Sequence, residues 1–161
     1  MKRFIIEQCD EELYTVHTGL ALVGLCLNRF TTMERQLAKR VGRCRGISHA
    51  DVLKSYVGLL SLGKSGYERL PSGKFATNAL IISLAVLAYN ILRYIGQMGL
   101  LGEVSPVRHP AKRRRIKTVI QELIYMACRV IRSGRRYKLR FGRCSPGYLA
   151  FRQVYNLLAF A

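Results

Sequence analysis

Carboxylate side chains are scarce in this sequence of 161 residues. It has 9 Asp and Glu against 27 Lys and Arg, which gives a formal net charge of +18. So few acids disfavour an active site that needs several carboxylates. So large a positive charge favours polyanionic partners, either nucleic acid or an anionic membrane surface.

Cysteine pairs with metal-ligand spacing are lacking as well. No two of the five cysteines form a C-x-x-C pair, and no histidine stands at ligand spacing beside them, so we expect no metal and no cofactor. The N-terminal stretch MKRFIIEQCDEE has too few apolar residues for a secretory signal. Together with the odd number of cysteines, this favours a reducing cytoplasm in which most of the thiols are buried. The cysteines are Cys9, Cys26, Cys44, Cys128 and Cys144.

Partnered catalytic groups are not visible either, so no enzymatic activity is expected. His17, His49 and His109 have no neighbour in sequence that would make one of them a general base. A group of acids near the N-terminus suits the first turn of a helix. No acid falls on a predicted strand, although two-metal sites collect carboxylates from separate elements, typically including strands. The N-terminal acids are Glu7, Asp10, Glu11 and Glu12.

A long uninterrupted hydrophobic run is also missing. The most apolar segment, FATNALIISLAVLAYNILRYIG, is broken by Ser83, Asn90 and Arg93. A membrane span needs about 20 predominantly apolar residues. We therefore predict a helix over 76–97 that is buried in protein, and do not expect a membrane span.

The stretch GLLSLGKS at 58–65 matches the P-loop pattern G-x-x-x-x-G-K-[ST]. Its context argues against a phosphate loop, because no strand precedes it and Gly66 and Pro71 interrupt any helix after it. Upstream, Ser48 and Asp51 form a helix-capping signal before residues at helical spacing. We predict a helix that begins after Ser48 and ends with Gly63 as its C′ residue, and no nucleotide binding.

Four further elements follow from periodicity and predict a mainly α fold with a short β-strand element. Helical spacing of apolar residues predicts helices over 11–29 and 114–133, and YLAFRQVYNLLAF predicts a closing helix. RYKLRFGR alternates with period two and predicts a strand over 136–143. The net charge changes from +3 over 1–68 to +15 over 69–161. We predict two regions, a helical one over 1–67 and a basic one over 68–161.

The basic region supplies the candidate DNA contacts. A run of cations lies at the start of the helix predicted over 114–133, where the helix dipole disfavours positive charge, and this favours an external phosphate. The predicted strand adds a basic exposed face, and about six phosphate contacts would give a salt slope near −5. A solvated charge run remains an alternative; Tyr137 and Phe141 either stack on bases or belong to the core. The candidates are Lys112, Arg113, Arg114, Arg115, Lys117, Arg132, Arg135, Arg136, Lys138 and Arg140.

Two blocks of the sequence resemble the Group 1 DDE transposases of bacterial insertion sequences. HTGLALVG and ISHADVLKSYVGLLSLGKS resemble the N-terminal portion of that family. ERLPSGKFATNALIISLAVLAYNILRYIGQ, RRRIKTVIQELIYMACRVIRSGRRYKLRFG and FRQVYNL resemble its C-terminal end. Together the blocks cover about nine tenths of the chain, in long stretches.

The resemblance implies a DNA-binding chain that has lost its catalytic core. In the family, a ribonuclease-H-like core between the two blocks carries the catalytic Asp, Asp and Glu that hold Mg²⁺ or Mn²⁺. Here Lys64 and Ser65 run almost directly into Glu68, which belongs after the missing helix and takes no catalytic role. The implied protein is an internally deleted, inactive transposase, cytoplasmic and nucleoid-associated, with DNA, itself or an intact transposase as partners. An unstable remnant and a cationic membrane-surface protein remain alternatives.

Overall fold

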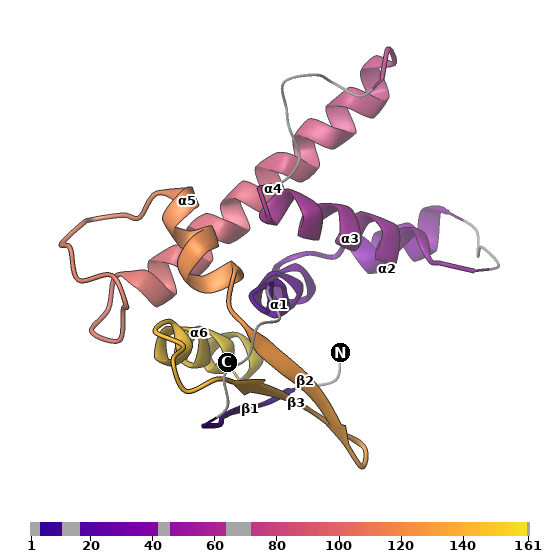
Figure 1. Cartoon of the computed structure of the whole chain (residues 1–161). Helices are drawn as coiled ribbons and strands as arrows, with labels where there is room; N and C mark the ends of the chain where they lie inside the picture. The colour runs from indigo at the N-terminus through magenta and orange to yellow at the C-terminus, as the bar shows by residue number, and fades with distance from the viewer. Residues whose placement is uncertain (1–3, 11–16, 42–45, 64–71, 161) are drawn as a thin grey trace.

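The computed structural model of the chain describes residues 4–10, 17–41, 46–63 and 72–160. These ranges are mainly helical, with a small three-stranded sheet, as the sequence predicted at this coarse level (Figure 1). In chain order, the elements are β1 (Phe4–Gln8), α1 (Leu20–Phe30), α2 (Met33–Arg40), α3 (His49–Ser61), α4 (Phe75–Leu100), α5 (Ile116–Val119), the π-helical turn η1 (Ile120–Ile124), β2 (Cys128–Ser133), β3 (Arg136–Phe141) and α6 (Tyr148–Phe160).

The sheet joins the two ends of the chain. Its order is β1-β3-β2: β2 and β3 form an antiparallel hairpin, and β1 pairs with β3 in parallel, with Phe4 opposite Tyr137. The backbone N–H of Phe4 also donates to the hydroxyl of Tyr155 on α6, at 2.6 Å. The predicted regions 1–67 and 68–161 thus pair with each other, while their status as separate domains stays a prediction.

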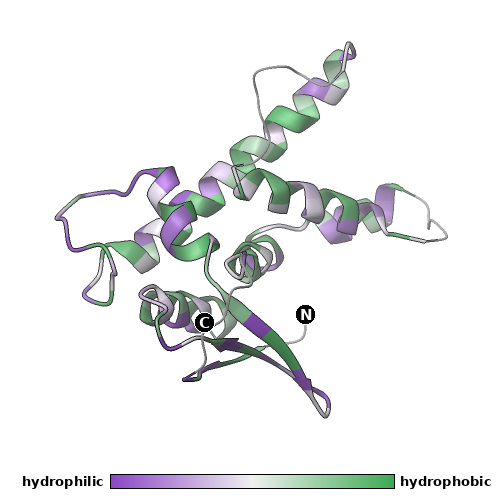
Figure 2. Cartoon of the chain, in the orientation of Figure 1, coloured by the Kyte–Doolittle hydropathy of each residue, from purple (hydrophilic) through white to green (hydrophobic). Residues whose placement is uncertain are grey.

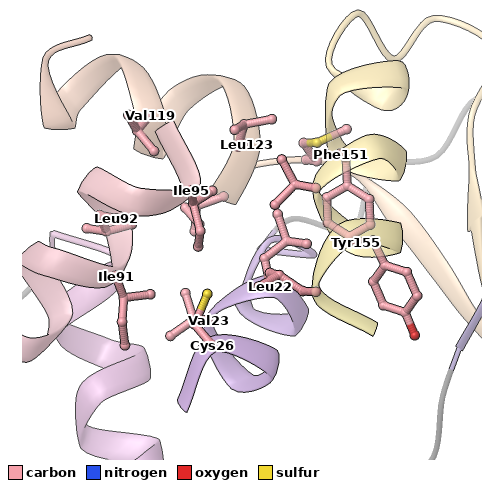
Figure 3. Packing of buried hydrophobic residues seen from close by; sticks show 14 of the residues in the cluster. Leu22, Val23, Cys26, Ile91, Leu92, Ile95, Val119, Leu123, Phe151 and Tyr155 are labelled. Carbon is pink, nitrogen blue, oxygen red and sulfur yellow. The ribbon is translucent and has the colours of Figure 1, made fainter. Parts of the chain in front are cut away.

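The core surrounds α1, which packs against α3, α4 and α6. Leu22, Val23 and Cys26 of α1 are at most 1% exposed. In Figure 3, Val23 and Cys26 lie toward α4 and Leu22 lies toward α6. Phe151 and Tyr155 of α6 close the core on the side of the sheet. One face of each of these helices is therefore fixed by apolar burial, which is the main favourable contribution to folding.

The helix predicted after Ser48 is confirmed at both ends. The Ser48 side chain accepts a hydrogen bond from the backbone N–H of Asp51, as a helix N-cap does. Residues 58–61 of the P-loop match form the last turn of α3, and Gly63 follows at a φ of 66°, which suits glycine at C′. Lys64 and Ser65 lie outside the described residues.

The predicted apolar helix exists but is buried along only part of its length. It runs from Phe75 to Leu100, and its first buried residue is Leu84, at 7% exposure. The expectation of a helix buried in protein is therefore wrong for the N-terminal third, which extends beyond α3 in Figure 1. By length and composition α4 is the one described helix that could cross a membrane.

The helix predicted over 114–133 is wrong in its second half. Helical structure ends at Ile124, and Cys128–Ser133 form strand β2 instead. A two-residue turn, with Gly134 at a φ of 59°, folds β2 back onto β3, so ladder hydrogen bonds replace helical ones. Helical spacing alone could not reveal this, because β-branched Val130 and Ile131 suit a strand equally well.

The N-terminal predictions also need correction. Glu7 lies on strand β1 and not in the first turn of a helix. The helix predicted over 11–29 begins at Leu20 within the described residues, since residues 17–19 are not helical and 11–16 lie outside the described ranges. Helix α2 had no predicted counterpart. The strand predicted over 136–143 and the closing helix are confirmed as β3 and α6, with β3 ending at Phe141.

Candidate nucleic-acid interface

Arg114 organises the loop between α4 and α5. Its Nε donates to the carbonyl of Leu100 at 2.9 Å, Nη2 to that of Val107 at 2.9 Å, and Nη1 to that of His109 at 2.5 Å. The side chain is half-buried. Arg114 is therefore an internal anchor of the loop, because each of its three side-chain nitrogens donates to a backbone carbonyl; its role as a phosphate ligand stays a prediction.

Four cations around this anchor are free to bind an external anion. Their side chains are exposed, and no ion pair joins them to any carboxylate in the described part of the chain. Arg108, which the sequence reasoning left out, is exposed in the same loop. We call the four predicted residues the α5 cation cluster: Lys112, Arg113, Arg115 and Lys117.

A second basic group surrounds the turn of the β2–β3 hairpin. Arg132, Arg135 and Arg136 are exposed there, and the Arg132 guanidinium lies 5.7 Å from the centre of the Tyr137 ring. The sequence placed Arg132 within the last turn of a helix, where the dipole would explain a cation. Because Arg132 lies on a strand, a helix dipole does not explain its position. The three arginines therefore form a second candidate surface for binding anions.

The remaining two candidates share one carboxylate within the sheet. Lys138 Nζ donates to Glu7 Oε2 at 3.0 Å and Arg140 Nε donates to Glu7 Oε1 at 2.8 Å. All three side chains are about one third exposed or less, at 30%, 35% and 26% in the order Lys138, Arg140 and Glu7. The predicted all-basic exposed strand face is thus wrong, because β1 brings a strand-borne carboxylate beside it.

The Glu7 contacts predict a pH dependence of stability. The hydrogen bonds from Lys138 and Arg140 hold the pKa of Glu7 below its ordinary value of 4.5. A lowered carboxyl pKa contributes stability above the ordinary value and loses it as the pH falls through the folded value. We expect Glu7→Gln to lower the melting temperature at pH 7, and the difference from wild type to shrink at pH 3.

Glu34→Gln is the control for this pH series. Glu34 pairs with Lys54 on the surface, at 69% exposure, and such pairs contribute little. Its variant should follow the wild-type melting curve at each pH. An equally large difference between Glu7→Gln and wild type at pH 3 and pH 7 would contradict a role for the Glu7 charge.

The structure does not bring the two free basic groups together. The loop that carries the α5 cation cluster and the hairpin turn lie at different edges of the molecule in Figure 1, and both are purple in the hydropathy colouring of Figure 2. They form two separate basic surfaces.

Of the aromatic candidates, Phe141 belongs to the core. It is fully buried against Tyr148 and Phe151, so it cannot stack on a base. Tyr137 is half-buried between Phe4 and Arg132. Base stacking is thus excluded for Phe141 and stays an untested alternative for Tyr137.

The histidines, acids and thiols form no assembled site in the described ranges, where no three His, Cys, Asp or Glu side chains gather as metal ligands do. His17 adopts a φ of 79° and lies edge-on to Tyr125 at 5.2 Å. Burial raises the pKa of the Cys26 thiol to about 12 and raises that of Cys128. These two cysteines match the expected buried thiols; Cys9 is half-buried, Cys144 is exposed and Cys44 lies outside the described residues.

Comparisons of the chain with protein-family models, with curated proteins and with solved structures find no significant match. A proposal of function therefore depends on the two basic surfaces and on the resemblance of the sequence to Group 1 DDE transposases.

Proposed function

We propose that this chain is a truncated insertion-sequence transposase that binds DNA and does not cut it. DNA contacts come from the α5 cation cluster and the hairpin turn, and the chain acts in the bacterial cytoplasm at the nucleoid. Sequence-independent binding of this kind is driven by Lys and Arg that neutralise phosphates and release counterions.

The proposal is supported by the different contacts that the cations next to α5 make. Arg114 donates to three backbone carbonyls, whereas the side chains of the α5 cation cluster are exposed and have no acidic partner among the described residues. Several like charges gathered at the start of α5 repel one another, which costs stability unless an anion screens them. A phosphate backbone supplies regularly spaced anions that relieve this repulsion.

The proposal that the chain does not cut DNA depends on the resemblance of its sequence to Group 1 DDE transposases. The family's ribonuclease-H-like core would fall between residues 65 and 68, where the present chain has two residues. We propose that the three-stranded sheet and the helices packed on it are the remnant that surrounds the deletion. Glu7 is the carboxylate on this sheet, and its contacts with Lys138 and Arg140 make it a poor metal ligand.

A salt titration of duplex-DNA binding tests the proposal. The variant replaces Lys112, Arg113, Arg115 and Lys117 with Gln and keeps the Arg114 anchor. Each lost phosphate contact should reduce the slope of log affinity against log salt by about 0.9, so the variant's slope becomes shallower by about 3 to 4. Fluorescence anisotropy of a labelled duplex measures affinity and slope together.

The matched control removes the same charge elsewhere. Arg35, Lys39, Arg40 and Lys74 are exposed on α2 and at the start of α4, and their replacement by Gln also lowers the formal charge by four. If the two variants have equal slopes, binding follows net charge and the site assignment is wrong. If the purified chain nicks a plasmid in the presence of Mg²⁺ or Mn²⁺, the proposal that it does not cut DNA is wrong.

A further inference from the structure

The exposed side of α4 carries an apolar row with a regular spacing. Phe75, Ala79, Ile82, Val86 and Tyr89 follow one another at intervals of four and three residues. All five are exposed, with Phe75 at 88%, Ile82 at 48%, Val86 at 54% and Tyr89 at 53%. This is the a/d spacing of a coiled-coil seam, continued over four turns. We call these five residues the α4 seam.

The seam is a second face of α4, separate from the one that its own core uses. Leu84, Ala88, Ile91 and Ile95 are buried, and they follow helical spacing on the opposite side of the helix. The N-terminal part of α4 extends past α3 in Figure 1, and Figure 2 colours much of it hydrophobic. No described element of this chain covers the seam.

We propose that the α4 seam is a homodimer interface, in which two copies of α4 pack antiparallel about a two-fold axis that crosses the seam midway between Ile82 and Val86. In that register Ala79 meets Tyr89 of the partner subunit, and Ile82 meets Val86 of the partner subunit. A small residue thus faces a large one and two β-branched residues face each other, as well-packed seams require.

The seam is large enough for a second copy. With about 200 Å² for a large aromatic side chain, its exposed parts amount to on the order of 500 Å² per chain. Two copies would bury about 1,000 Å², which reaches the lower limit of a specific interface. Polar Ser83 and Asn90 border the seam, as expected for the rim of a protein interface and not for a helix surrounded by lipid.

The charge of the chain gives this dimer a distinctive salt dependence. Each copy has a formal charge of +18, and the one charged residue of α4 is Arg93, which faces Phe75 of the partner subunit in this register; the five seam residues carry no charge. Salt screens the repulsion between the two copies and leaves the apolar contact intact. Dimerisation should therefore strengthen as salt rises, whereas DNA binding weakens.

Sedimentation equilibrium of the full chain, at loading concentrations from about 1 to 300 µM, tests the proposal. We expect twice the monomer mass of 18.3 kDa at the upper end. Ile82→Gln should weaken the dimer at least about tenfold, since it removes two apolar side chains from the seam. Leu80→Gln is the matched control, because Leu80 is 49% exposed on the same helix but lies off the seam.

A charge pair tests the antiparallel register. Ala79→Glu and Tyr89→Lys should each weaken the dimer, and the double variant should regain at least about tenfold, because position 79 then faces the opposite charge at position 89 of the other copy. In a parallel dimer like charges would face each other and the double variant would regain nothing, which overturns this packing. A chain that stays monomeric, or equal effects of Ile82→Gln and Leu80→Gln, overturns the interface. Circular dichroism verifies that each variant folds.

A monomer that floats with vesicles of anionic phospholipid would assign the seam to a membrane surface and would also overturn the dimer. The proposal does not rest on DNA binding. A chain that stays monomeric but shows the expected DNA titration contradicts the dimer alone. A chain that dimerises but does not bind DNA contradicts the proposed function alone.

Discussion

Gly19→Ala should be among the most destabilising single substitutions in this chain. A Cβ at this position would lie 2.0 Å from the carbonyl oxygen of Leu123 and 2.3 Å from Cα of Ile124. Both atoms belong to the backbone, so no side chain can rotate away to make room. We expect a loss of about 3 kcal/mol, or about 10 °C in melting temperature, measured by thermal denaturation.

The cost arises because the segment before α1 runs directly against the end of η1. The backbone N–H of Gly19 donates to the carbonyl of Ile124 at 3.1 Å, and Thr18 donates from both its backbone N–H and its hydroxyl to the carbonyl of Met126. An alanine at position 19 would separate these segments and break their hydrogen bonds. The backbone of Gly19 is itself right-handed helical, at φ −61°, so the effect comes from packing alone.

Gly102→Ala is the control for this substitution. No atom lies within 4 Å of a Cβ at Gly102, which is exposed after α4. Its replacement should change the stability by no more than about 0.5 kcal/mol. Equal melting temperatures for Gly19→Ala and wild type would mean that the two segments are not in contact in solution.

Gly19 also illustrates which parts of the fold could be read from the sequence. Features set by neighbouring residues were predicted: the Ser48 cap, the glycine end of α3, the alternation of β3 and the helix α6. Features that require partners distant in sequence were not. The approach of Gly19 to Leu123 joins residues about a hundred positions apart, and helical or strand periodicity contains no information about such contacts.

The candidate site follows the same rule. Exposure of Lys112, Arg113 and Arg115 was foreseen because a polar run beside a loop is exposed wherever the rest of the chain goes. Lys138 and Arg140 differ, because the strand that carries Glu7 pairs with theirs only in the folded chain. Charge counts along the sequence could find the basic segment but could not tell an anchored cation from a free one.

Arg114 and Arg113 should separate stability from DNA binding, although they are adjacent. Arg114→Lys keeps the charge but replaces the planar guanidinium with an ammonium on a flexible stem, which cannot reach three carbonyls in one plane. We expect it to lose at least two of the three hydrogen bonds to Leu100, Val107 and His109, and to destabilise the chain by about 2 kcal/mol. Thermal denaturation measures that loss, and hydrogen exchange should locate it in residues 101–113.

Arg113→Lys is the matched variant, because Arg113 is exposed and donates no described hydrogen bond to the loop. It should leave the melting temperature unchanged, since its charge remains in solvent, and should preserve the salt slope of DNA binding because a lysine still neutralises one phosphate. Arg114→Lys should reduce DNA affinity despite an unchanged net charge, because the α5 cation cluster is no longer held in one arrangement before it meets DNA. If Arg114→Lys binds DNA as wild type does at a temperature where both are folded, the anchor serves stability alone.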